Sequence, residues 1–106
     1  MKRYRLSPIA EDDLAAIGDF IAEQGGAVAA DRAFDTVLAA FDRIADSPGI
    51  GHRREDVTSK SIRIWRVFDY LVIYRPETRP LEILRIWHGA RVPSRIDDAI
   101  READDT

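Results

Sequence analysis

Hydrophobic residues follow a helical period in the first half of the chain and a strand-like pattern in the second. In residues 8–46 apolar side chains recur every three or four positions, whereas residues 62–88 are rich in β-branched and aromatic residues. A chain whose helices precede its strands cannot build repeated strand–helix–strand units. This order predicts an α+β fold, in which a helical hairpin covers one face of a twisted sheet.

Two helices are predicted in the first half. The first covers about residues 8–24, because Ser7 is a favourable N-cap and Pro8 suits the first helical position. The second covers about residues 27–46 and carries its own apolar stripe. The connection at Gly25-Gly26 is short, so the two helices are expected to lie antiparallel as a hairpin.

The remaining elements are a short first strand, three strands of an antiparallel meander and a short last helix. Turn residues near Asp69 and from Pro76 to Pro80 separate the three meander strands. We expect residues 1–106 to form a single domain. The predicted ranges are 3–6 for the first strand, 62–68, 70–75 and 81–88 for the meander, and 94–103 for the helix.

Composition excludes several classes of protein. The chain has 106 residues and no cysteine, which excludes a disulfide scaffold, a zinc ribbon and a thiol enzyme. His52 and His88 are the only histidines and have no carboxylate at a metal-ligand spacing, so neither a metal nor a cofactor is expected. No export signal or membrane helix is recognisable, which predicts a cytoplasmic protein with no membrane partner.

Charge is distributed unevenly along the chain. The net charge is −3, yet residues 51–95 carry 10 basic and 5 acidic side chains. The overall charge argues against a general nucleic-acid binder, and no sequence-specific nucleic-acid binding is expected. The acidic stretch from Asp97 to Asp105 could fold over the basic block.

Three segments resemble ParE-type toxins of the RelE/ParE superfamily, the toxins of plasmid-stabilisation toxin–antitoxin modules. They are the start Tyr4-Arg-Leu-Ser-Pro-Ile-Ala-Glu-Asp-Asp-Leu, the run from Arg63 to Arg75, and the segment Ile-Leu-Arg-Ile-Trp-His-Gly-Ala-Arg that ends at Arg91. The resemblance covers residues 3–92. The family's order of strand, two helices and three-stranded meander agrees with the order read from periodicity.

The resemblance implies a growth-inhibiting toxin that a cognate ParD-like antitoxin neutralises. It also implies DNA gyrase as the target of the ParE branch and ribosome-bound mRNA as the target of the RelE branch. RelE-like nucleases often carry a tyrosine near the C-terminus, and residues 89–106 contain none. The acidic net charge and the missing tyrosine favour the gyrase-binding branch. A RelE-like endoribonuclease and an inert antitoxin-binding member remain the alternatives.

A basic patch is the candidate target site. Its predicted members are Arg63, Arg85, His88 and Arg91, whose guanidiniums can hold phosphates or carboxylates bidentately. If the chain is a nuclease, Arg63, His88 and Arg91 are the catalytic candidates. His88 can equally be a structural histidine that is hydrogen-bonded near the sheet edge.

The expected strand pairing places Arg63 and Arg85 on one face together with Trp65 and Trp87. Such interleaved arginines and tryptophans suit either base stacking or packing inside the domain. The sequence leaves both interpretations open.

Part of the apolar surface of the two helices is the candidate antitoxin site. Four short strands cannot cover both helical stripes, so Ile9, Phe20 and Leu38 are predicted to stay open for an amphipathic antitoxin segment. The alternative is that these residues belong to the core.

Overall fold

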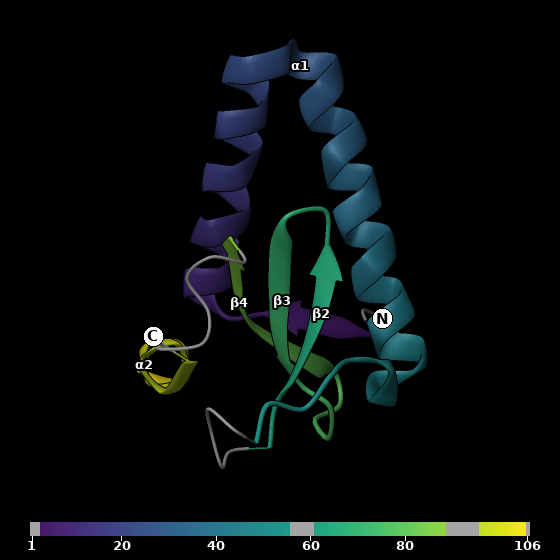
Figure 1. The fold of residues 1–106 in the computed structure, drawn as a ribbon, viewed down its shortest axis with the longest axis vertical. Helices are drawn as coiled ribbons and strands as arrows, with labels where there is room; N and C mark the ends of the chain where they lie inside the picture. Colours follow the sequence, from purple (N-terminus) through teal and green to yellow (C-terminus); the bar gives the residue numbers. More distant parts are fainter. Residues whose placement is uncertain (1–2, 56–60, 89–95, 106) are drawn as a thin grey trace.

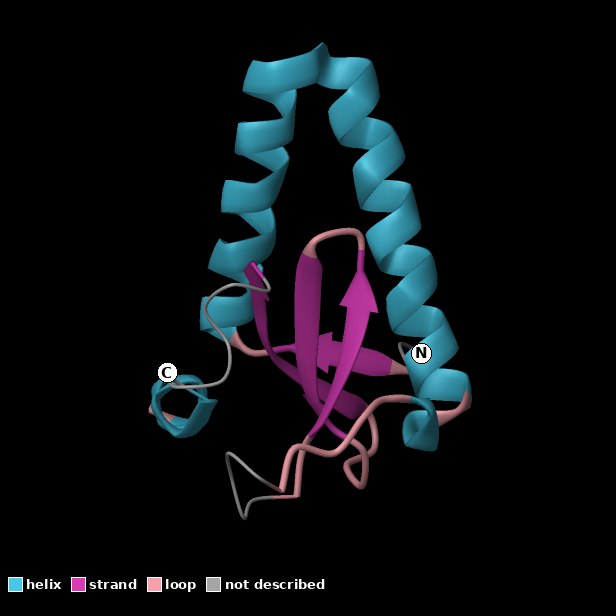
Figure 2. Cartoon of the chain, viewed as in Figure 1, coloured by secondary structure: helices cyan, strands magenta, loops and turns pink. Residues whose placement is uncertain are grey.

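The computed structural model describes residues 3–55, 61–88 and 96–105, and it confirms the α+β class. A strand, a long helix, three strands and a last helix follow one another along the chain (Figures 1 and 2). The predicted helix start at residue 94 lies outside the described residues. The elements are β1 (Tyr4–Leu6), α1 (Pro8–Asp46), the 3₁₀ helix η1 (Pro48–Ile50), β2 (Arg63–Val67), β3 (Tyr70–Arg75), β4 (Leu81–His88) and α2 (Ile96–Asp104).

Ser7 begins α1 and fixes it to the sheet. Its Oγ accepts a hydrogen bond from the Ala10 N–H at 3.1 Å, as expected of an N-cap. The same hydroxyl donates to the Leu84 carbonyl of β4 at 2.8 Å. The helix start is therefore held against β4, where β1 ends.

The structure corrects the prediction of two separate helices. One helix, α1, runs for 39 residues and is kinked at Gly26, whose φ of 87° and ψ of 177° are accessible to glycine alone. No loop is needed, because a single glycine supplies the turn. The two arms of α1 run from this kink toward the sheet (Figure 1). Neither α1 nor α2, as far as they are described, could span a membrane.

The sheet is mixed and has the strand order β1-β4-β3-β2. The meander β2-β3-β4 is antiparallel as predicted, whereas β1 lies parallel to β4. The register between β3 and β4 shifts by one residue after Ile73. Ile73 pairs with Arg85, whereas the next residue, Tyr74, pairs with Ile83. Leu84 is the extra residue of this bulge, and it changes the face to which the following side chains point.

Each face of the sheet has its own hydrophobic core, because α1 covers one face and α2 covers the other. The core under α1 includes Phe41 and Tyr74, both fully buried. The core under α2 includes Leu84 and Trp87. The sequence predicted helices on one face of the sheet only, so the position of α2 on the second face corrects that prediction.

Candidate functional site

The structure divides the predicted basic patch between the two ends of the sheet. Arg63 opens β2 and pairs with Tyr74, whereas His88 closes β4 and pairs with Tyr70 at the other end of β3. Arg85 lies on β4, three residues from His88. Arg91 lies outside the described residues.

The expectation that both arginines and both tryptophans share one face is wrong. Trp65 packs in the core under α1, where the Arg43 guanidinium lies 5.6 Å from its ring centroid. Trp87 packs in the core under α2, and the Arg85 guanidinium lies 4.9 Å from its ring centroid. The strand register and the bulge at Leu84 cause this separation.

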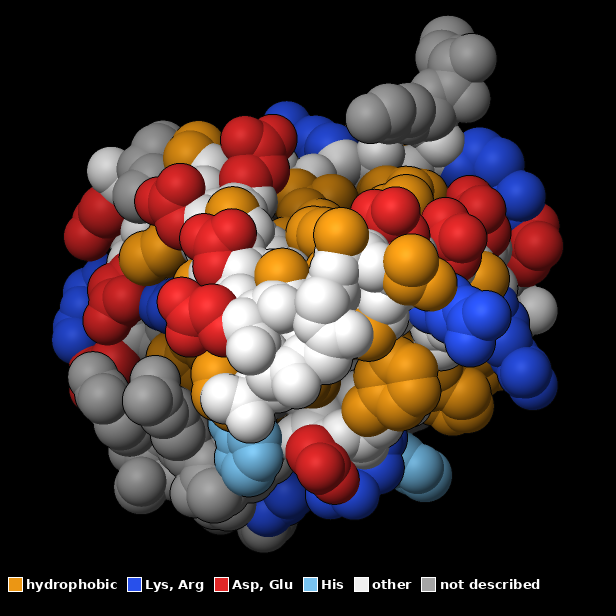
Figure 3. Space-filling view, turned by 90° about the horizontal axis from the view of Figure 1, so that it is seen from above, with side chains coloured by type: hydrophobic (Ala, Val, Ile, Leu, Met, Phe, Trp, Pro, Cys, Tyr) orange, Lys and Arg blue, Asp and Glu red, His pale blue; other side chains and the backbone are white. Residues whose placement is uncertain are grey.

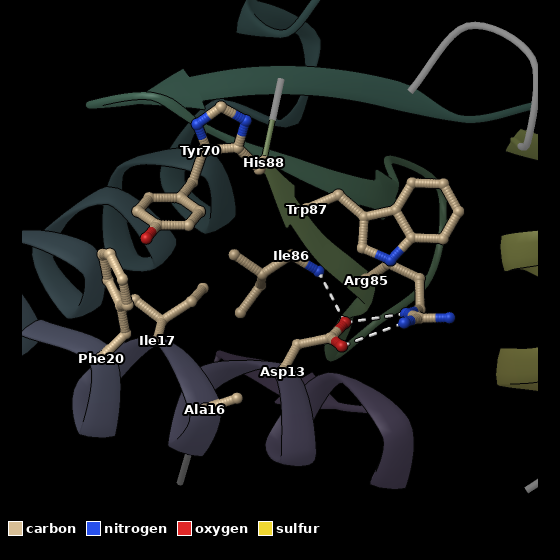
Figure 4. A pocket seen from close by; sticks show the side chains of 9 residues that line it. All are labelled: Asp13, Ala16, Ile17, Phe20, Tyr70, Arg85, Ile86, Trp87 and His88. Carbon is tan, nitrogen blue, oxygen red and sulfur yellow. Dashed lines mark hydrogen bonds and ion pairs between the residues drawn. The ribbon is translucent and has the colours of Figure 1, made fainter. Parts of the chain in front are cut away.

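A pocket lies between the first arm of α1 and the end of β4, and we name it the His88 pocket (Figure 4). It brings together two of the four predicted target residues and one of the three predicted antitoxin contacts. Its lining comes from α1, β3 and β4. The residues are Asp13, Ala16, Ile17, Phe20, Tyr70, Arg85, Ile86, Trp87 and His88.

One end of the His88 pocket is aromatic. The rings of Tyr70 and His88 meet edge to face, with centroids 5.9 Å apart and planes at 87°. Phe20 lies on the α1 side of the same end and is 55% exposed (Figure 4). This end can accept a planar or apolar group from a partner and offers an imidazole beside it.

The other end of the pocket holds a buried ion pair. The Nε and Nη2 atoms of Arg85 donate to the two carboxylate oxygens of Asp13 at 2.7 and 3.0 Å (Figure 4). Asp13 also accepts the Ile86 N–H at 3.1 Å, at the edge of β4 that β1 leaves open. From α2, Glu102 accepts a third hydrogen bond from Arg85, at 2.7 Å.

These contacts stabilise the charged form of Arg85. Burial alone lowers the pKa of its guanidinium, but the hydrogen bonds and charges of Asp13 and Glu102 outweigh burial and raise that pKa. The guanidinium is thus a fixed cation matched by two carboxylates. A partner that binds it has to compete with both of them.

Asp13 and Tyr70 are site residues that sequence reasoning missed. Asp13 follows Glu11 and Asp12 near the start of α1, where acidic side chains are common. It nevertheless falls between Ala10 and Ile17, on the stripe that faces the sheet. A carboxylate at a core-facing position is the signal that could have predicted a buried cationic partner.

The acidic tail does lie against basic residues of the sheet. Asp104 of α2 accepts from Arg75 at 2.9 Å through both of its oxygens, while Glu102 pairs with Arg85. Four apolar residues of α2 are buried against the sheet at the same time: Ile96, Ala99, Ile100 and Ala103.

Among the described residues, no three acidic or histidine side chains are close enough to hold a metal ion.

The three predicted antitoxin contacts differ in exposure. Phe20 and Leu38 are 55% and 39% exposed, whereas Ile9 is partly buried against the core under α2. On the kinked end of the molecule, hydrophobic side chains remain visible among acidic ones (Figure 3). Phe20 and Leu38 therefore present apolar side chains to solvent, one on each arm of α1.

Comparisons with known proteins agree with this architecture. A family model described as "ParE toxin of type II toxin-antitoxin system, parDE" matches residues 4–93. A solved structure described as "Chromosomal ParDE TA system from P. aeruginosa" is similar in fold, with a TM-score of 0.69 at 20% sequence identity, over 83% of this chain and 96% of that one. No curated relative matches the chain.

Proposed function

The chain belongs to the ParE toxin family of type II toxin–antitoxin systems, and we propose that it inhibits growth by binding DNA gyrase until a ParD-like antitoxin neutralises it. One observation carries the neutralisation part of this proposal. Phe20, a predicted antitoxin contact, and His88, a predicted target contact, line the same pocket. An antitoxin segment seated on Phe20 would cover the imidazole and exclude the target.

The antitoxin contact is proposed along the exposed side of α1. Phe20 and Leu38 present apolar area to solvent, and an amphipathic helix could bury both. Ile9 would contribute only at the margin, because the core under α2 already covers part of it. Aromatic residues, phenylalanine among them, are enriched at protein interfaces, which favours Phe20 as a contact.

The target contact is proposed at the His88 pocket, with Arg85 and His88 as its described members. Arg91 follows β4 closely in sequence and belongs to the same proposal. Arg63 would make a separate contact. It belongs to β2 and pairs with Tyr74, at the end of β3 opposite to the end that pairs with His88. Gyrase is the proposed target because the resemblance to the ParE branch implies it, and the mode of action is binding without turnover.

Induced expression tests the toxin role, and binding measurements test the neutralisation. We expect growth to stop when the chain is expressed alone and to continue when the product of the adjacent small gene is co-expressed. Unchanged growth would favour the inert family member. Light scattering of the purified chain mixed with that product should show a complex.

Two variants then locate the antitoxin contact. Phe20→Ala should weaken antitoxin binding at least tenfold. Val28→Ala is the matched control, because Val28 is 66% exposed on the same helix but does not line the pocket. Equal effects of the two substitutions would contradict the proposed contact.

A RelE-like nuclease is the second candidate, and one observation favours it. Tyr70 lies beside His88, so the pocket holds a phenol as well as an imidazole, and both can transfer protons. In that case Tyr70→Phe should reduce mRNA cleavage on ribosomes by about 10²–10⁴ without loss of folding. No cleavage by the parent chain would exclude this candidate.

A further inference from the structure

A second cleft lies at the opposite end of the sheet from the His88 pocket, and three arginines line it. Arg53 follows η1, Arg63 opens β2, and Arg79 belongs to the turn between β3 and β4. Gly49 and Glu77 also line this cleft, which we name the arginine cleft. The fold brings these residues together from separate parts of the sequence.

Backbone carbonyls, not carboxylates, hold two of the guanidiniums. Arg63 donates to the Gly51 carbonyl at 2.8 Å, and Arg79 donates to two carbonyls of its own turn at 3.0 and 2.7 Å. No carboxylate among residues 3–55, 61–88 and 96–105 forms an ion pair with either arginine. A guanidinium fixed by neutral acceptors keeps its full positive charge and further N–H donors for a ligand.

The remaining charges leave the arginine cleft positive. The Arg53 Nε lies 3.2 Å from Glu55, but both side chains are at least half exposed, so this pair is weak. Among the described residues that line the cleft, Glu77 is the one carboxylate, and it accepts a hydrogen bond from Ser61 at 2.8 Å. Three guanidiniums therefore face one carboxylate.

A buried tyrosine fixes one wall of the cleft. The Tyr74 hydroxyl donates to the Pro48 carbonyl at 2.6 Å and accepts the Gly51 N–H at 3.0 Å. Arg63 bonds to the same Gly51, so its position is set before any ligand arrives. The space above Gly49 is open, since a Cβ built there would meet no heavy atom within 4 Å.

We propose that the arginine cleft binds a backbone phosphate of a single-stranded nucleic acid without reading its sequence. Guanidiniums match the geometry of phosphate oxygens bidentately. No aromatic residue lines the described cleft, so a base has no surface on which to stack. Pro48, Ile62 and Pro76 also line the cleft, so an acidic peptide is the competing occupant that the second test has to exclude. This inference stands apart from the proposed toxin activity.

The first test uses inorganic phosphate as the probe. Titration of the full chain should shift the amide NMR signals of Gly49 and Gly51 saturably, compared with sodium chloride at equal ionic strength. The double variant Arg53→Gln/Arg79→Gln should bind phosphate at least tenfold more weakly. Arg32→Gln, an exposed arginine in the second arm of α1, removes one positive charge far from the cleft and should bind like the parent.

A steric variant checks the location without touching any arginine. Gly49→Asp places a carboxylate in the open space and should abolish the phosphate shifts at an unchanged melting temperature. Phosphate shifts that persist in this variant, or that are equally lost in Arg32→Gln, would overturn the proposal. So would the absence of any saturable shift in the parent chain.

The second test identifies the source of the phosphate. Single-stranded oligonucleotides of ten thymidines and of ten adenosines should bind equally well. Because one phosphate is neutralised, binding should weaken about 2.6-fold between 50 and 200 mM salt, since the salt slope for single strands is about −0.7 per phosphate. Poly-glutamate of equal charge should bind more weakly, and tighter binding of poly-glutamate would overturn the assignment. If the phosphate test or the oligonucleotide test fails, growth inhibition by the chain is unaffected, and the toxin proposal stands independently.

Discussion

At the scale of single residues, Arg85 joins three elements. It is only 11% exposed, and its guanidinium contacts Asp13 of α1 and Glu102 of α2 while belonging to β4. Glu102 is 43% exposed and can return to water if the contact is lost. Asp13 is only 14% exposed and cannot return to water if Arg85 is lost. The stability of the fold therefore depends on the Asp13–Arg85 pair more than on the Glu102–Arg85 pair.

Removal of Arg85 alone should therefore destabilise the fold strongly. Arg85→Met leaves the Asp13 carboxylate buried without a counter-charge, which should cost about 3–5 kcal/mol in free energy of unfolding. Glu102→Gln should cost less than about 1 kcal/mol, because that pair is half exposed. Urea denaturation of the three proteins measures both differences.

A double variant separates the structural role of Arg85 from its proposed role in target binding. Asp13→Asn/Arg85→Met removes both charges, while the amide oxygen still accepts the Ile86 N–H. It should recover most of the lost stability but inhibit growth less than the parent. A double variant as unstable as Arg85→Met would show that the unpaired carboxylate is not the cause.

Tyr74 gives the fold a predictable dependence on alkaline pH. Burial raises the pKa of its phenol above the ordinary value, and the Gly51 hydrogen bond and the Arg63 charge offset this only in part. The unfolded chain therefore loses this proton first, near pH 10. The contribution of the Tyr74 phenol to the free energy of unfolding is fully present below that pH, and it is lost as the pH rises toward the folded-state pKa.

Tyr74→Phe tests this account at two pH ranges. At pH 7 it should cost about 1–3 kcal/mol, because the Pro48 carbonyl and the Gly51 N–H lose their partner. Above pH 10 its stability should fall less steeply than that of the parent. A residual fall is expected from Tyr4, whose pKa is also raised by burial. Identical slopes for parent and variant would contradict the assignment.

At the scale of elements, the kink of α1 is the feature that shapes the molecule. It lets one helix lay two arms along the same face of the sheet (Figure 1). The arms also touch, since a Cβ at Gly18 would come within 2.4 Å of the Phe34 ring. Glycine is thus required at position 26 because other residues avoid that backbone conformation. It is required at position 18 because the Phe34 ring of the other arm leaves no room for a Cβ.

Substitution at the kink should be costly. Gly26→Ala forces a Cβ into a conformation that L-residues avoid, which should lower the free energy of unfolding by about 1–3 kcal/mol. Gly49→Ala is the matched control, because its backbone is unstrained and its surroundings are open. Its effect should stay within about 0.5 kcal/mol. If urea denaturation gives similar losses of unfolding free energy for Gly26→Ala and Gly49→Ala, the positive φ at Gly26 is not the cause of the destabilisation.

Element positions were more predictable than side-chain surroundings. Periodicity placed the three meander strands within a residue or two, and Ser7-Pro8 marked the start of α1 correctly. The continuity of α1 through Gly26 was missed, because two glycines predict a break whether or not a loop follows. The faces of Arg85 and Trp87 were missed because a bulge at Leu84 leaves no trace in an alternating pattern.

At the scale of the whole molecule, the two halves of the candidate site come from different elements. α1 contributes the apolar side with Phe20, and the β3–β4 pair contributes Tyr70 and His88. The sequence predicted Phe20 and His88 for different partners, and only the fold shows that they share a pocket. In the proposed function, that overlap lets one antitoxin segment cover the proposed target site directly.

The most direct measurement of this account is DNA supercoiling by gyrase in the presence of the purified chain. We predict that supercoiling falls as the chain is added, that inhibition saturates at a fixed ratio of chain to gyrase, and that the adjacent-gene antitoxin reverses it. Saturation at a fixed ratio follows from the proposed mode of action, in which the chain binds gyrase without turnover. If gyrase stays fully active while the chain cuts mRNA on ribosomes, gyrase is not the target and the nuclease interpretation replaces it.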